Sequence, residues 1–437
     1  MMPLGVHPVE AEPDLDADLA AAVRAYAARN PASRDRFEQA SRVMPGGNTR
    51  SVLYFSPFPL CMMRGAGCRL WDADDHGYVD MLGEFTAGIY GHSDPTIRAA
   101  IDAALDDGIN LSGHNHLEAE LARVVCERFP SIDLIRFANS GTEANLMALA
   151  AAKAFTGRRK ILVFEGGYHG GFLAFPPGGS RVNVPHEFVI APYNDIDATL
   201  RLIGEAGEDL AAVLAEPMLG AGGCVPAEPA FLDMLRTETK RLGAILIFDE
   251  VMTSRLSPGG RQALLGITPD MTTLGKYIGG GLTFGAFGGR ADIMAQFDPR
   301  RADALFHAGT FNNNTVTMAA GVAGLTKILT PERSRDLNAR GDRLRDGLNE
   351  LFTRTGAALR VTGLGSVMNL HAAGEPAAAA AIKDLVFFDL VARGFYLARR
   401  GLIALSLPVT DVETGAFIDA MAEIIAARRS ILCAAST

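Results

Sequence analysis

The sequence has few cysteines, and none of them forms a CxxC pair. The chain of 437 residues contains an odd number, five, at Cys61, Cys68, Cys126, Cys224 and Cys433. A disulfide framework is therefore not expected, and a reducing compartment is favoured. No apolar run reaches the length of a membrane span, and residues 1–12 lack the basic and apolar regions of a signal peptide. These absences predict a protein of the cytoplasm without a membrane partner.

Excess positive charge and a metal-ligand pattern are also missing. The formal net charge is −9 at pH 7, which argues against nucleic acid as the main partner. The segment His114-Asn115-His116 has no third ligand at a plausible spacing, so we expect a loop and the start of a helix there and no metal site. Hydrophobic residues make up 48% of the chain, enough for a large core.

The N-terminal part of the chain predicts a helix and then a hairpin. Apolar residues recur at spacings of three and four between Asp16 and Val43, which favours a helix, and Met44-Pro45-Gly46-Gly47-Asn48 ends it. The segments 69–72 and 78–81 are typical of strands, and Asp74-Asp75-His76-Gly77 between them is typical of a turn.

The central part alternates short apolar runs with helical segments, which predicts an α/β fold. Continuous apolar runs are typical of strands buried on both faces of a parallel sheet, and they occur at 134–137, 161–164, 212–215 and 244–248. A long helix is expected over 333–355 and a helical alanine run over 377–381. We therefore expect an N-terminal segment (1–80) that joins a small domain, a large domain (81–329) and the rest of the small α+β domain (330–437).

Polar groups follow several of these strands, where ligands bind in open α/β sheets. After the first strand, Ser140 and Glu143 fit a capping box, and free amides at the next helix start make a phosphate cradle. An ordinary helix cap is the alternative. After the next strand, Gly166 to Gly171 include Tyr168, which either stacks on a flat ring or is incidental to a glycine-rich turn.

Asp249 and Lys276 form the most informative pair. Glu216 ends the third strand, and Asp249 ends the fourth after five apolar residues. A carboxylate at such a place keeps a pyridinium nitrogen protonated, so that the ring acts as an electron sink. Lys276 lies in a glycine-rich turn, which suits a partly desolvated lysine that forms a Schiff base. Together they predict a site for pyridoxal 5'-phosphate (PLP).

Two arginines are candidates for binding substrate carboxylates. Arg50 follows a Pro-Gly-Gly-Asn-Thr turn, and Arg400 precedes Gly401. Arginine binds carboxylates through two parallel hydrogen bonds, although most arginines are simply exposed cations. The apolar residues 52–55 are either a substrate pocket or core.

In combination, six motifs resemble those of class III (subgroup II) aminotransferases of fold type I, most closely the bacterial β-amino-acid aminotransferases of the β-phenylalanine type. The resemblance covers residues 33–415, and its motifs are residues 44–51, 139–145, 166–171, 248–253, 273–276 and 309–314. It implies a large domain with a mostly parallel sheet flanked by helices, and a small domain built from both termini.

The resemblance also implies a role for each site residue. Lys276 would carry the cofactor and move the proton, and Asp249 would pair with the ring nitrogen. The other cofactor contacts would be Ser140, Gly141 and Thr142 (phosphate), Tyr168 and Val251 (ring faces), Glu216 (polar support) and Thr310 (phosphate of the neighbouring subunit in a homodimer). Arg50 and Arg400 match the positions that bind substrate carboxylates.

The resemblance implies a transaminase that moves the amino group of a β-amino acid to a 2-oxo acid such as 2-oxoglutarate or pyruvate. The alternative is a glutamate-1-semialdehyde 2,1-aminomutase. Many class III members have Thr-Gly-(Phe/Tyr)-(Gly/Arg) where this chain has Thr253-Ser254-Arg255-Leu256, and this departure disfavours the aminomutase. A third possibility, a non-enzymatic binding protein, is disfavoured because every cofactor position holds a competent residue type.

Overall fold

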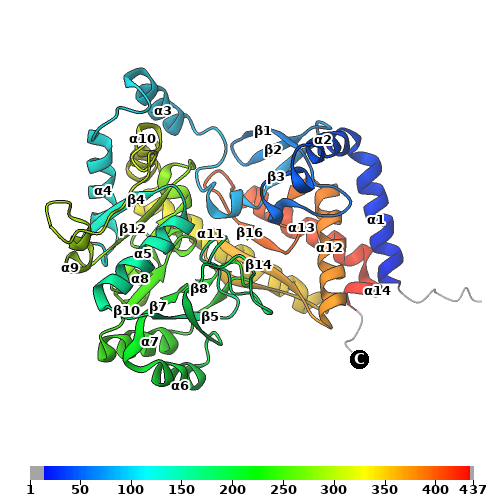
Figure 1. Cartoon of the computed structure of the whole chain (residues 1–437). Coiled ribbons are helices and arrows are strands. Elements are labelled where there is room, and N and C mark those ends of the chain that lie inside the picture. Colours follow the sequence, from blue (N-terminus) through cyan, green and yellow to red (C-terminus); the bar gives the residue numbers. More distant parts are fainter. Residues whose placement is uncertain (1–13, 434–437) are drawn as a thin grey trace, which may run out of the picture.

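The computed structural model describes residues 14–433, which form two lobes (Figure 1). The larger lobe contains a seven-stranded sheet in the order β4-β12-β11-β10-β7-β5-β6. Its strands are β4 (Leu134–Ala138), β5 (Lys160–Phe164), β6 (Glu187–Ala191), β7 (Leu210–Ala215), β10 (Ile245–Asp249), β11 (Met271–Gly275) and β12 (Gly285–Gly289). The four apolar runs predicted as strands are confirmed as β4, β5, β7 and β10.

The sheet is mostly parallel, as predicted, but it contains one antiparallel strand. β12 pairs antiparallel with β11 on one side and with β4 on the other. The sequence did not reveal β12 because Gly-Ala-Phe-Gly-Gly has no apolar run. The glycine at its start is required, since a Cβ on Gly285 would lie 2.0 Å from the Ser140 carbonyl oxygen. β12 therefore lies directly against the backbone of the predicted phosphate cradle.

Helices cover both faces of this sheet. Two apolar clusters, one on each face, include residues of α5 and α9 and residues of α6 and α7, respectively. The helices of this lobe are α3 (Pro95–Asp107), α4 (His116–Arg128), α5 (Gly141–Thr156), α6 (Ile196–Ala206), α7 (Pro229–Leu242), α8 (Gly260–Leu265), α9 (Ala291–Met294) and α10 (Thr315–Ala323). As predicted for His114-Asn115-His116, a helix begins there, and the Asn115 side chain caps α4 by accepting from Glu118 N at 3.0 Å.

The smaller lobe is built from both ends of the chain. β15 pairs in parallel with β3, so Phe395 lies beside Val79 in the sheet β1-β2-β3-β15. A second sheet of this lobe has the order β13-β14-β16. The strands of the smaller lobe are β1 (Met62–Ala66), β2 (Arg69–Asp72), β3 (Gly77–Asp80), β13 (Leu359–Leu364), β14 (Val367–Ala372), β15 (Phe395–Tyr396) and β16 (Leu402–Ala404). A separate two-stranded sheet, β8 (Met218–Leu219) with β9 (Val225–Pro226), lies between β7 and α7 in the chain. The predicted hairpin is thus β2–β3, while the domain boundaries at residues 80 and 329 stay a prediction.

The helices of the smaller lobe confirm two expectations and correct a third. They are α1 (Leu15–Arg29), α2 (Pro31–Ser41), α11 (Pro331–Thr355), α12 (Pro376–Ala392), α13 (Asp411–Ala427) and α14 (Arg429–Leu432). α11 and α12 contain the predicted helix at 333–355 and the alanine run. The single helix expected over 16–43 is wrong: the chain breaks at Asn30, because Pro31 lacks the amide that would continue the helix.

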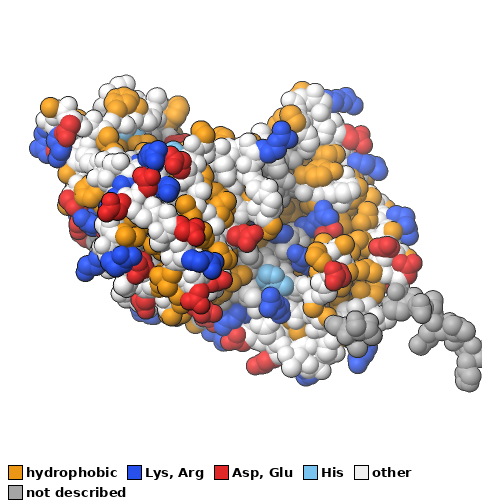
Figure 2. Space-filling model, turned by 60° about the horizontal axis from the view of Figure 1, so that its bottom comes forward, with side chains coloured by type: hydrophobic (Ala, Val, Ile, Leu, Met, Phe, Trp, Pro, Cys, Tyr) orange, Lys and Arg blue, Asp and Glu red, His pale blue; other side chains and the backbone are white. Residues whose placement is uncertain are grey.

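The surface carries charges of both signs. On the face in Figure 2, acidic and basic side chains are interspersed rather than gathered into patches of one sign. Within residues 14–433, no helix is long and apolar enough to span a membrane.

Candidate active site

The start of α5 lies at the carboxyl end of β4 and presents Ser140, Gly141 and Thr142. The Ser140 hydroxyl accepts a hydrogen bond from Glu143 N at 3.1 Å and caps the helix. The capping box predicted here is half correct, because the Glu143 carboxylate accepts from Asn139 N at 3.0 Å and not from the amide of Ser140. A Cβ on Gly141 would lie 2.9 Å from the Val251 side chain, so only glycine allows Val251 to approach this closely.

Asp249 ends β10 and is held by three donors. Its Oδ2 accepts from Asn145 Nδ2 at 2.9 Å and lies 2.7 Å from His169 Nδ1, while its Oδ1 accepts from Val251 N at 3.0 Å. Burial lowers the pKa of His169, but the hydrogen bond and the charge of Asp249 outweigh burial and raise it. The raised pKa favours the protonated form of His169 beside this carboxylate. Thr273 Oγ1 donates to Asn145 Oδ1 at 2.7 Å and fixes the orientation of that amide.

Lys276 follows β11 with a left-handed backbone, at φ 56°. Its ammonium group donates to the carbonyl oxygen of Phe85 at 2.6 Å. Burial lowers the pKa of the amine to about 8; the charge of Asp249 opposes this, whereas Arg50 and Arg400 add to it. These effects place Asp249 and both arginines within electrostatic reach of the amine.

Glu216 lies within electrostatic reach of Asp249 and is hydrogen-bonded to the backbone of Tyr168. The Glu216 carboxylate accepts from Tyr168 N at 3.0 Å and from Gly220 N at 2.9 Å, and burial raises its pKa. The Tyr168 side chain is half exposed, so its ring is free to stack on a ligand. Arg400 is half-buried, and Tyr168 and Glu216 lie within electrostatic reach of its guanidinium.

The two arginines approach the same aromatic ring from different segments. The guanidinium carbon of Arg50 lies 5.3 Å from the ring centroid of Phe85, and that of Arg400 lies 5.7 Å from it. Arg50 also forms an ion pair with Glu84, the residue before Phe85. The sequence identified both arginines but not the aromatic residue that joins them.

The segment Gly83–Thr86 is a left-handed turn. Its four residues have φ values of 51°, 47°, 53° and 79°, and three of them are not glycine. Such conformations cost about 1–3 kcal/mol each and persist only where the surroundings hold them. The turn therefore needs contacts with other segments to hold the Phe85 carbonyl where it accepts the hydrogen bond from Lys276.

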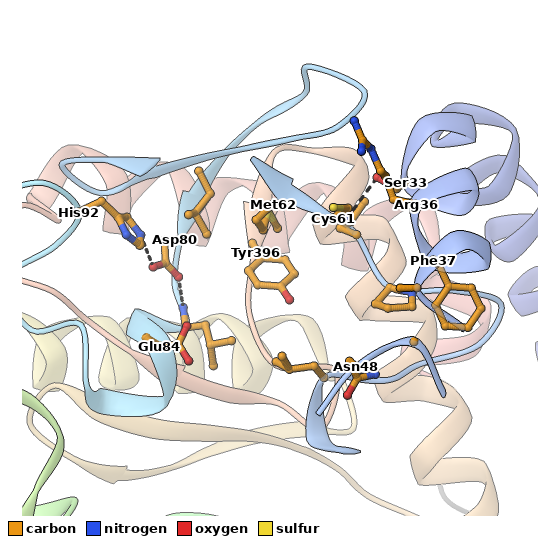
Figure 3. Close-up of a pocket in the computed structure, with 17 residues that line it drawn as sticks. Ser33, Arg36, Phe37, Asn48, Cys61, Met62, Asp80, Glu84, His92 and Tyr396 are labelled. Carbon is orange, nitrogen blue, oxygen red and sulfur yellow. Dashed lines mark hydrogen bonds and ion pairs between the residues drawn. The ribbon is translucent and has the colours of Figure 1, made fainter. Parts of the chain in front are cut away.

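A cavity of about 330 Å³ lies behind Glu84 (Figure 3). α2, the segments around Asn48 and Leu53, and residues of β1 to β3 line it, with Tyr396. Of residues 52–55, left open between pocket and core, Leu53 lines this cavity, Phe55 is buried core, and Val52 and Tyr54 are each 49% exposed.

Thr310 is exposed on the loop before α10. Asn312 on this loop accepts from Asn139 Nδ2 at 2.9 Å, so the loop lies against the segment before Ser140. Phe306 and Phe311 on either side of Thr310 are 88% and 57% exposed.

Sequence reasoning missed several members of the site. Asn145, His169 and Thr273 lie within quoted motifs, but only the structure shows that they hold Asp249 in place. Glu84 and Phe85 lie outside every motif, and nothing in the sequence indicated them.

The residues present fit PLP. A capped helix start offers amides to a phosphate, Asp249 is a buried carboxylate that accepts hydrogen bonds from Asn145 and Val251, and Lys276 is an amine with a lowered pKa. Such an arrangement on a mostly parallel α/β sheet defines an enzyme of fold type I that forms a Schiff base through a lysine.

Comparisons with known proteins agree with this class. The family model for aminotransferase class III matches residues 54–425, so the chain belongs to the class III aminotransferases, which are PLP-dependent enzymes. A β-phenylalanine transaminase from Variovorax paradoxus is 53% identical over 96% of this chain and 98% of its own length. The solved structure of a β-phenylalanine aminotransferase from the same organism has a TM-score of 0.94 at 52% identity and covers 96% of this chain and 99% of that one. A glutamate-1-semialdehyde 2,1-aminomutase from Methanothermobacter thermautotrophicus is 38% identical over 78% of this chain and 84% of its own length.

Proposed function

We propose that this aminotransferase moves the amino group of a β-amino acid to a 2-oxo acid such as 2-oxoglutarate or pyruvate. The observation that carries the proposal is the placement of Arg50 and Arg400 over one ring, Phe85, whose carbonyl accepts from Lys276. A β-amino acid and a 2-oxo acid present their carboxylates at different distances from the reacting carbon. Two arginines on different segments provide one carboxylate-binding group for each of these distances. The identity to the Variovorax β-phenylalanine transaminase supports the same substrate class.

Each cofactor contact follows from the position of the residue. Ser140, Gly141 and Thr142 would hold the phosphate at the start of α5, where amides and the helix dipole favour an anion. Tyr168 and Val251 would enclose the two faces of the ring. Asp249 would hold a proton on the ring nitrogen, and Glu216 would support the ring as a polar neighbour. Bound PLP supplies an electrophilic carbon for the amino group and an electron sink for the carbanion.

Lys276 is the base and acid of the proposed reaction. Its pKa of about 8 gives a useful fraction of neutral amine near neutral pH, so Lys276 Nζ would take the proton from the amine-bearing carbon and then, as the ammonium, act as the acid that gives it back. The carbonyl of Phe85 orients the amine between these steps. Asn145 and His169 hold the Asp249 carboxylate in place throughout.

The two arginines divide the carboxylates between them. Arg50 would bind the carboxylate of the β-amino acid, after its ion pair with Glu84 opens. Arg400 would bind the carboxylate of the 2-oxo acid beside Tyr168, in a more desolvated place where its pKa is lowered by burial.

We also propose that the active unit is a homodimer in which Thr310 reaches the phosphate in the neighbouring subunit. The exposed Phe306 and Phe311 beside it are apolar surface of the kind that a second subunit covers. Mixed dimers test this: Lys276→Ala and Thr310→Asp subunits are each inactive alone, but together they give one site with an intact lysine and an intact threonine. Recovery of activity on mixing supports the shared site, and no recovery in verified mixed dimers contradicts it.

The location proposed for the enzyme is the cytoplasm. All five cysteines are free thiols in the structure, which suits a reducing compartment.

A donor panel tests the reaction. β-Phenylalanine and β-aminobutyrate should react faster than α-alanine, and turnover should require an added 2-oxo acid. Fast turnover of glutamate-1-semialdehyde without an acceptor would identify an aminomutase instead. A preference for α-alanine over both β-amino acids would reject the proposed substrate class.

A further inference from the structure

Arg255 is the largest fully buried side chain among the described residues. It lies in a short 3₁₀ helix, Thr253–Leu256, just after the segment that contains Asp249 and Val251. The structure records no ion pair for it within residues 14–433. Burying a charged group without a counter-ion is expensive unless hydrogen bonds compensate. Burial lowers its pKa to about 10, so the guanidinium remains protonated at neutral pH.

The guanidinium compensates by binding three separate segments. Its Nε donates to Ser366 Oγ at 3.1 Å, its Nη1 donates to the Thr86 carbonyl at 3.3 Å, and its Nη2 donates to the Leu405 carbonyl. Ser366 in turn donates to Asn338 Oδ1 at 2.9 Å, which anchors this arrangement to α11. The planar fork of arginine suits three acceptors in different directions, which a lysine ammonium on a flexible stem does not reproduce.

Two of these segments belong to the substrate site. Thr86 ends the left-handed turn whose Phe85 ring lies 5.3 Å from the guanidinium carbon of Arg50 and whose Phe85 carbonyl accepts from Lys276. Leu405 follows β16 (Leu402–Ala404), which begins two residues after Arg400. The turn and this strand touch directly, since a Cβ on Gly83 would lie 2.5 Å from the Ala404 carbonyl oxygen. Arg255 therefore links the supports of Arg50 and Arg400.

We propose that Arg255 is a positioning residue that sets the spacing of Arg50 and Arg400 by holding the Gly83–Thr86 turn against the end of β16. This inference rests on the proposed function, in which those two arginines bind substrate carboxylates. It explains why a buried cation occupies this position, where many family members have Gly-(Phe/Tyr)-(Gly/Arg) after the threonine. It also identifies one of the outside contacts that this turn needs, beside the hydrogen bond from Gly83 N to Asp80 Oδ1 at 3.0 Å.

The test compares carboxylate binding with turnover in the loaded enzyme. Arg255→Lys keeps the positive charge but cannot donate to all three acceptors at once. Arg255→Met keeps a side chain of similar volume but removes the charge. The control is Arg158→Met. Arg158 also donates to two carbonyls, those of Leu210 at the start of β7 and Leu242 at the end of α7, so it lies at the edge of the sheet away from the candidate site. For each variant, kcat and KM for β-phenylalanine, the inhibition constant of 3-phenylpropionate and the Tm are measured.

Both Arg255 variants should raise KM and the inhibition constant about ten-fold, with kcat changed less than three-fold. That is about 1.4 kcal/mol of carboxylate binding. Arg158→Met should lower the Tm and leave both binding constants within two-fold. If Arg255→Met does not fold, Arg255→Lys alone decides.

The proposal is overturned if the Arg255 variants change the Tm or kcat while KM and the inhibition constant stay within two-fold, or if the control raises these constants equally. Failure of the proposed function is a separate result, because it appears in the wild-type donor panel. In that case β-phenylalanine is replaced by the best donor of the panel, and 3-phenylpropionate by the analogue of that donor without its amino group. The variant-to-wild-type ratios of KM and of the inhibition constant then decide the role of Arg255 by the same limits.

Discussion

The ammonium group of Lys276 donates a hydrogen bond of 2.6 Å to the carbonyl oxygen of Phe85, a residue 191 positions earlier in the chain. This bond joins the end of β11 in the large lobe to the left-handed turn that also supports Arg50. The amine is thus oriented by a backbone group, whose position depends on the turn and not on the identity of a side chain.

The lowered pKa of Lys276 predicts the pH dependence of cofactor capture. Only the neutral amine attacks an aldehyde, so in cofactor-free protein the rate of PLP capture should rise with pH and level off above about 8. Stopped-flow absorbance follows the reaction, and Lys276→Ala should lack this phase. A rate that continues to rise to about 10.5, as expected for an exposed lysine, would show that the amine is not desolvated.

The same shift predicts how the cofactor-free protein's stability depends on pH. The pKa of Lys276 is lower in the folded state, so the unfolded chain binds more protons between about pH 8 and the ordinary lysine value. Lys276→Met should therefore raise the free energy of unfolding near pH 7 by about 1–3 kcal/mol, and this gain should fade as the pH rises through that window. Urea titrations measure it, and a gain that is constant with pH would contradict the assignment.

The raised pKa of His169 predicts that its contribution to folding stability changes with pH in the opposite direction. Its pKa is raised in the folded state, so the stability that the protonated His169–Asp249 pair contributes is fully present below about pH 6.5 and is lost as the pH rises through the raised pKa. The loss of unfolding free energy in His169→Gln should be largest in mild acid. His186 is a matched control, because burial lowers its pKa and His186→Gln should show the reverse trend.

Arg50 and Arg400 predict separate losses in the two half-reactions. Arg400→Ala should slow the half-reaction with the 2-oxo acid about 30-fold or more and impair the half-reaction with a β-amino acid less, and Arg50→Ala should do the reverse. Single-turnover absorbance of each half-reaction measures both. Arg354→Ala, an exposed arginine of α11, should change neither. Equal losses in the two half-reactions would reject the division between the arginines.

Glu84 predicts a gain of affinity. Its ion pair with Arg50 must open before a substrate carboxylate binds, and both side chains are about half exposed, at 54% and 43%. Exposed pairs contribute about 0–1 kcal/mol, so Glu84→Gln should lower KM for the β-amino acid by at most about five-fold. Glu127→Gln, which breaks the exposed pair with Arg123, should leave KM unchanged. A rise in KM would mean that Glu84 positions Arg50 instead of competing with its ligand.

The sequence by itself determined the strands and the chemistry at their ends. Four apolar runs became β4, β5, β7 and β10, and Ser140, Glu216 and Asp249 lie at the carboxyl ends of three of them, which meet at one edge of the sheet. Lys276 was predictable for the same local reason, as a cation in a glycine-rich turn after β11.

Only the tertiary structure decided which distant segments meet. β12 could not be predicted, because a glycine-rich strand has no apolar pattern. Gly285 at its start is required by the close approach of the Ser140 backbone and not by its own neighbours in sequence. Phe85, Glu84 and Arg255 act through contacts with residues far away in the chain, and the left-handed turn that arranges them is costly in isolation. Local pattern predicts elements and strand ends, whereas the spacing of Arg50 and Arg400, the arginines proposed to bind carboxylates, depends on how distant segments pack around Phe85.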